Sequence, residues 1–93
     1  MSKLTWYGIS ATQIFTKGKY IVIDPYLTKN PLGPFALENI KADIILCTHG
    51  AKDHFGDAVE LAKLTGAMLI GPVDCTIRAK DQGVDPDKCK NIV

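Results

Sequence analysis

Residues 43–54 read DIILCTHGAKDH, an apolar run followed at once by two histidines and an aspartate. The apolar part, residues 44–47, predicts a buried strand, and the amphipathic segment 58–64 predicts the helix that comes next. The polar residues between them therefore lie in a strand-to-helix loop, where active-site residues usually sit in open α/β sheets. This stretch predicts an α/β fold and places a candidate site within it.

Three side chains of this loop, His49, Asp53 and His54, are candidate metal ligands. Catalytic zinc typically takes about three protein ligands from imidazole, thiolate and carboxylate groups and keeps one position open for water. The same residues also fit a purely structural interpretation, in which the histidines are polar loop residues and Asp53 helps to cap the following helix. The loop alone does not decide between a metal site and a cap.

Strand and helix patterns continue on both sides of this loop. Strand patterns bounded by turn residues occur around Leu4 and Trp6 and at residues 11–15, 20–23, 44–47 and 67–70. Helix patterns occur at residues 57–64 and 74–82, followed by Gly66 and Gly83. Residues 24–35, with three prolines and a glycine, predict an irregular loop, and residues 91–93 predict the start of another strand.

The composition is that of an ordinary globular chain. Of the 93 residues, 46% are hydrophobic and 23% are charged, and the formal net charge is +1. Basic residues form no block, and no apolar run reaches the roughly 20 residues of a membrane span. We therefore expect no nucleic-acid or membrane partner and a cytoplasmic location. Cys47, Cys75 and Cys89 lack C-x-x-C spacing, which argues against a disulfide framework or a zinc ribbon.

Four separated motifs, in the same order, make the sequence resemble the metallo-β-lactamase superfamily. The motifs are LTWYGISA at 4–11, IVIDPYL at 21–27 with NP at 30–31, ADIILCTH at 42–49, and GDA at 56–58. The chain is most similar to the metal-dependent hydrolases grouped with the ascorbate-6-phosphate lactonase branch, whose opening reads G-H-S-A and whose ligand signature reads T-H-x-H-x-D-H. The resemblance implies hydrolysis of a lactone, ester or phosphoester by metal-activated water.

Two positions depart from the pattern of that family. The second histidine of the signature is Ala51 here, and the histidine of the opening motif is Ile9. The resemblance implies that His49 serves one metal and that Asp53 and His54 serve a second, with Asp53 also the candidate for orienting the attacking water. Because alanine offers no donor, we expect a weakened first metal site.

Asp24 matches the aspartate that follows a strand in this family. The resemblance implies that its carboxylate is not a ligand and orients the ligand loop through hydrogen bonds, as the outer partners of metal ligands do. Aspartate before Pro25 is also a common turn former, so a simple turn cap fits the sequence equally well.

The family fold is an αββα sandwich of two similar halves packed face to face. Residues 1–93 are expected to form a single partial domain that corresponds to the N-terminal half, an α/β sheet with helices on one face. The other face is then expected to be apolar and to require a partner, either a second copy in a homo-oligomer or a chain that supplies the second half-domain. The later ligands of the family lie outside these residues.

Three hypotheses about function follow. The chain is a truncated metal-dependent hydrolase with a degenerate metal motif, inactive alone; or it is a catalytically dead remnant that acts as a binding or assembly module; or it is one half of a split hydrolase. Whether the chain alone is an enzyme stays open. If it binds a cofactor, its imidazole and carboxylate groups suit a divalent metal such as zinc or manganese.

Overall fold

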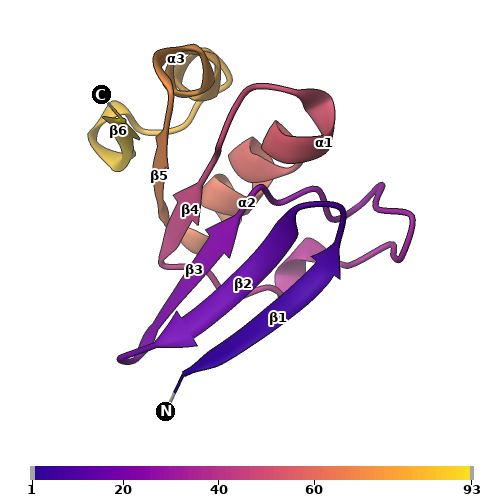
Figure 1. Ribbon diagram of the computed structural model, residues 1–93. Coiled ribbons are helices and arrows are strands. Elements are labelled where there is room, and N and C mark those ends of the chain that lie inside the picture. The colour runs from indigo at the N-terminus through magenta and orange to yellow at the C-terminus, as the bar shows by residue number, and fades with distance from the viewer. Residues whose placement is uncertain (1, 93) are drawn as a thin grey trace.

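The computed structural model describes residues 2–92, which form a mixed six-stranded sheet. Its strands are β1 (Lys3–Gly8), β2 (Ala11–Thr16), β3 (Lys19–Ile23), β4 (Ile44–Leu46), β5 (Met68–Gly71) and β6 (Cys89–Asn91). They lie side by side in sequence order (Figure 1), with β1, β2 and β3 antiparallel and β3 to β6 parallel. Each parallel connection contains helical residues, as parallel strands require.

The helices cover one face of this sheet (Figure 1). They are α1 (Lys52–Phe55), α2 (Ala58–Thr65) and α3 (Val73–Asp81), with short 3-10 helices η1 (Leu37–Asn39) and η2 (Pro86–Lys88). The α/β fold class predicted from the sequence, a half sandwich with helices on one face, is confirmed. Residues 24–35 contain no helix or strand, in agreement with the irregular loop expected there.

Several element boundaries differ from the sequence prediction. Residues 52–55 form the one-turn helix α1 where a loop was expected, so Asp53 and His54 lie on a helix. The last strand begins at Cys89 and ends at Asn91, earlier than predicted, and Val93 lies outside the described residues. Helix α2 begins at Ala58, one residue later than predicted; Asp57 is its N-cap residue, and the Asp57 carboxylate bonds to the amides of Leu27 and Thr28 and not to the helix.

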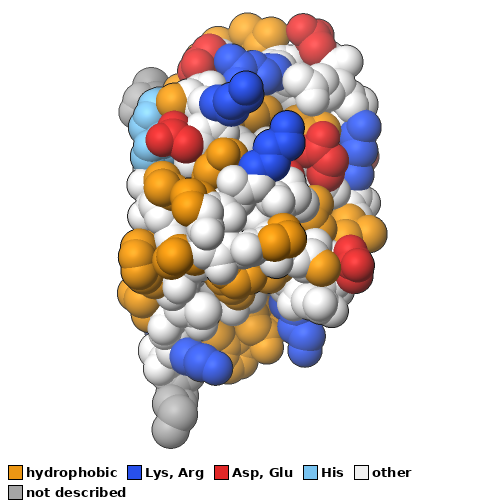
Figure 2. Space-filling model, turned by 90° about the vertical axis from the view of Figure 1, so that its right-hand side faces the viewer, with side chains coloured by type: hydrophobic (Ala, Val, Ile, Leu, Met, Phe, Trp, Pro, Cys, Tyr) orange, Lys and Arg blue, Asp and Glu red, His pale blue; other side chains and the backbone are white. Residues whose placement is uncertain are grey.

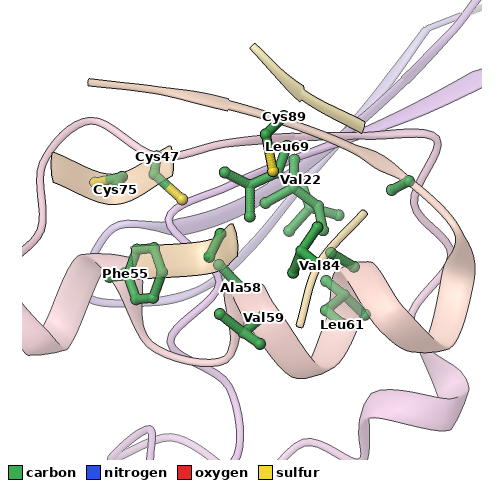
Figure 3. Packing of buried hydrophobic residues seen from close by; sticks show 14 of the residues in the cluster. Val22, Cys47, Phe55, Ala58, Val59, Leu61, Leu69, Cys75, Val84 and Cys89 are labelled. Atoms are coloured by element: carbon green, nitrogen blue, oxygen red, sulfur yellow. The ribbon is translucent and has the colours of Figure 1, made fainter. Parts of the chain in front are cut away.

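The core lies between the sheet and the helices. Val22, Ile45 and Leu69 occupy matching positions on β3, β4 and β5 and are fully buried. Figure 3 shows Val22 and Leu69 pointing toward the helix layer, where Leu61 of α2 is also fully buried. Alternate residues of these strands thus face the helices, which fixes the direction of the polar segments that follow each strand.

The opposite face of the sheet carries two rows of mostly apolar residues. The rows are Leu4, Ile14, Ile21, Ile44 and Met68, and Trp6, Thr12, Ile23, Leu46 and Ile70. Leu4 and Trp6 are 67% and 61% exposed, and the others are half-buried by their neighbours. On the side of the molecule seen in Figure 2, by contrast, basic and acidic side chains lie among hydrophobic ones over the upper part. Within residues 2–92, no helix has the length and apolarity needed to cross a membrane.

Candidate metal-ligand site

The candidate site lies at the carboxyl ends of β3 and β4, where Asp24 connects two segments. Asp24 directly follows β3, is 2% exposed, and has a positive φ of 48°. Its Oδ1 accepts a hydrogen bond from the backbone N–H of Thr48 at 2.7 Å, and its Oδ2 accepts one from the Thr48 hydroxyl at 2.8 Å. Oδ2 also lies 2.9 Å from Nδ1 of His54. The carboxylate therefore bonds to residues 48–54, called the histidine segment below, and does not cap the turn at Pro25.

These bonds select the tautomer of both histidines. A carboxylate only accepts hydrogen bonds, so the Nδ1 atom of neutral His54 carries the proton that is donated to Asp24. The Thr48 hydroxyl gives its proton to Asp24 and so accepts from Nδ1 of His49, which lies 2.9 Å away. In both rings Nε2 is left with its lone pair, which is the form of imidazole that binds a metal.

Among the three predicted ligands, His54 lies close to both His49 and Asp53. The ring centroids of His49 and His54 are 3.9 Å apart, and Nε2 of His54 lies 3.8 Å from Oδ1 of Asp53. Even so, no three histidine, cysteine, aspartate or glutamate side chains converge closely enough among residues 2–92 to hold a metal ion. The residues fit a metal centre in part: they supply imidazole and carboxylate donors, but not a convergent set of about three.

The two positions that depart from the family motifs are Ala51 and Ile9. Ala51 is exposed and occupies the N-cap position of α1, with no side-chain donor or acceptor. Ile9, in the turn between β1 and β2, has a positive φ of 56°, which is costly for a β-branched residue. Lys52 is exposed and forms no ion pair within the described residues.

Two residues of this region had no role in the sequence interpretation. Thr48 connects Asp24 to His49, and the only signal for it was its place as the first letter of the signature. Arg78 of α3 donates from Nη1 to the backbone oxygen of Gly50 at 3.0 Å, and nothing in the sequence marked it. Arg78, Lys52 and Lys29 also line a hollow of about 490 Å³ between α1, α2, α3 and residues 26–29.

Comparisons with known proteins agree with this architecture. A profile of the β-lactamase superfamily domain matches residues 3–82 of the chain. Since that match covers most of the sequence, the chain belongs to the β-lactamase superfamily.

The chain is also similar to curated hydrolases and to a solved structure. UPF0173 metal-dependent hydrolases of Geobacillus sp. and Methanopyrus kandleri are 46% and 39% identical, over 89% and 97% of this chain. The structure of a metallo hydrolase from the hyperthermophilic archaeon Ignicoccus hospitalis matches 98% of this chain with a TM-score of 0.79 and 35% identity. The chain covers 37%, 39% and 38% of these three proteins, so it spans little more than a third of their length.

A buried thiol lies directly before the histidine segment. Cys47 is 1% exposed, and Figure 3 shows it near Cys75 in the core under α3. Burial, followed by smaller contributions from the nearby Cys75 and Asp24, raises the pKa of the Cys47 thiol from 9.0 to about 12. Burial also raises the pKa of Cys75 and Cys89.

This raised pKa predicts a loss of stability at high pH. In the unfolded chain the thiol ionises near pH 9, whereas in the folded chain it stays neutral until about pH 12. The stabilisation is therefore fully present below about pH 9 and is lost as the pH rises toward 12, by about 1.4 kcal/mol per pH unit. Urea unfolding of wild type and Cys47→Ala between pH 8 and about 10.5 measures the difference in slope. Parallel pH curves for the two proteins would contradict the assignment.

Proposed function

We propose that this chain contributes the first ligand segment of a metal-dependent hydrolase. The observation that carries the proposal is the network around Asp24, which leaves Nε2 of both His49 and His54 free to bind a metal. Asp53 adds a carboxylate 3.8 Å from one of these nitrogens. Imidazole with carboxylate suits zinc or manganese among the common divalent ions.

The reaction class is hydrolysis of a lactone, ester or phosphoester. A bound metal would supply Lewis acidity and lower the pKa of its water toward about 7. The Asp53 side chain is 54% exposed, so its carboxylate is accessible to a water molecule and is the group that would orient it. Asp24 and Thr48 hold the imidazoles in place through their hydrogen bonds.

The chain is proposed to need further donors before it can catalyse this reaction. Within the described residues fewer than three metal-binding side chains converge, and the relatives are more than twice as long as the matched region. A second half-domain, in a partner chain or in a second copy of this chain, would supply the remaining donors and cover the apolar face of the sheet. Alone, the 93 residues are proposed to be inactive.

A second candidate function is a binding or assembly module without catalysis. Two observations favour it: Ala51 and Ile9 stand where the resembling hydrolases have histidines, and the sheet offers an open apolar face through Leu4 and Trp6. In this case the Asp24 network is a structural link between β3 and β4.

Metal content separates the two functions. The purified chain is fractionated by size and each fraction is analysed for zinc and manganese, followed by a zinc titration of the metal-free chain. The hydrolase proposal predicts bound metal, and His54→Ala should weaken binding by at least about 100-fold, because even loss of an outer partner of a ligand costs 10- to 100-fold. Ala51→His should tighten binding by adding a donor.

Asp81→Ala, an exposed carboxylate of α3, is the matched control and should bind as the wild type does. Absence of metal from every size fraction, together with identical titrations for wild type and His54→Ala, would leave the binding or assembly module as the function.

A further inference from the structure

A single side chain of α3 holds the histidine segment at two points. Arg78 donates from Nη1 to the backbone oxygen of Gly50 at 3.0 Å, and its guanidinium carbon lies 5.0 Å from the ring centroid of Phe55. Gly50 directly follows His49, and Phe55 directly follows His54. The two contacts therefore fall next to the two imidazoles in the sequence.

The backbone at Gly50 runs close to α3, which makes this contact possible. A Cβ added at Gly50 would lie 2.6 Å from Oδ2 of Asp74 and 3.2 Å from Nη2 of Arg78. Only glycine lets the chain pass this close to both side chains without moving them. The segment is thus held from the sheet side by Asp24 and from the helix side by Arg78.

We infer that Arg78 is a positioning residue for the metal ligands His49 and His54. Phe55 is buried, so the ring under the guanidinium is a fixed support, and the planar guanidinium can stack on the ring while one of its N–H groups bonds to Gly50. Ligands must be held within about 0.5 Å of their binding geometry to act together. That Arg78 positions metal ligands rests on the proposed metal function. Its stabilisation of the histidine segment can be measured without metal.

Amide hydrogen exchange of the metal-free chain tests whether Arg78 stabilises the position of the histidine segment. The amides of Phe55 and Gly56 bond to Ala51 and Lys52 and report on this segment. In Arg78→Ala they should exchange roughly five to tenfold faster, as expected for loss of a charged donor and a cation–π contact at an exposed site. The amide of Leu61 in α2 bonds to the backbone oxygen of Asp57, and that of Met68 at the start of β5 bonds to the backbone oxygen of Asp43; both should keep their wild-type rates.

Two further variants serve as a conservative substitution and as a control. Arg78→Lys keeps the charge but loses the planar group, so exchange at Phe55 and Gly56 should fall between wild type and Arg78→Ala. Lys80→Ala removes another exposed cation of α3 with no contact to the segment and should behave as wild type. Equal exchange in the Arg78→Ala and Lys80→Ala proteins, or uniform acceleration across the whole chain, would overturn the inference.

Titration with zinc alone then separates this inference from the proposed function. If wild type binds zinc, Arg78→Ala should bind it at least about fivefold more weakly, in proportion to the lost contacts. Equal zinc affinity in the two proteins would overturn the positioning role. If neither protein binds zinc but exchange at Phe55 and Gly56 is selectively faster, the hold by Arg78 is supported and the metal function fails.

Discussion

Replacement of Asp24 by alanine is expected to lower the free energy of unfolding by about 3 to 5 kcal/mol. The change removes a buried acceptor of three hydrogen bonds and leaves donors of Thr48 and His54 without a partner. It also places alanine at a φ of 48°, where aspartate and asparagine are tolerated better. Urea unfolding followed by far-ultraviolet circular dichroism measures the loss.

Two variants serve as controls for Asp24→Ala. Asp24→Asn keeps one acceptor for Thr48 and tolerates the positive φ, so it should lose about half as much stability. Asp43→Ala removes an exposed carboxylate with one bond to the Tyr20 amide and should cost about 1 kcal/mol. If Asp24→Ala is no more harmful than Asp43→Ala, the carboxylate does not connect the two segments as described.

Replacement of Gly56 by alanine is the second change with a large expected effect. Gly56 joins α1 to α2 with φ 47° and ψ −119°, a conformation that residues with a Cβ rarely adopt. An added Cβ would lie 2.7 Å from the backbone oxygen of Pro25 and 2.7 Å from Cα of Tyr26. Backbone atoms cannot rotate away, so we expect a loss of about 3 kcal/mol or more and displacement of α1 with its Asp53 and His54.

Gly66→Ala is the matched control for Gly56→Ala. Gly66 ends α2 with a φ of 73°, but an added Cβ would meet nothing within 4 Å. Only the conformational cost remains, about 1 kcal/mol. Denaturation of both variants in parallel measures the difference, and equal losses would show that the contact with residues 25–26 does not restrict Gly56.

The sequence predicted the sheet and its large helices because their patterns are local. It did not predict which residues of β4 face the helices, since Ile44, Ile45 and Leu46 are all apolar and show no alternation. Pairing with β3 and β5 decides that Ile45 points inward. Helix α1 was missed because four residues are too few to show a helical period.

The candidate site was predictable only as a set of residue types. His49, Asp53, His54 and Asp24 were found through motifs, and their roles as ligands or supports stay predictions. The bonds from Asp24 to Thr48 and His54 join residues 24 and 30 positions apart, and the bond from Arg78 to Gly50 spans 28. Such contacts depend on how the strands and helices pack, which no local pattern records.

The order of the strands has a consequence for how the protein forms during synthesis. Each strand from β2 to β6 pairs with the strand that precedes it in the chain. When one of these strands leaves the ribosome, its preceding hydrogen-bonding neighbour has therefore already been made. Because each pairing joins strands that are consecutive in the chain, the sheet can grow strand by strand from the N-terminus while the chain is still being translated.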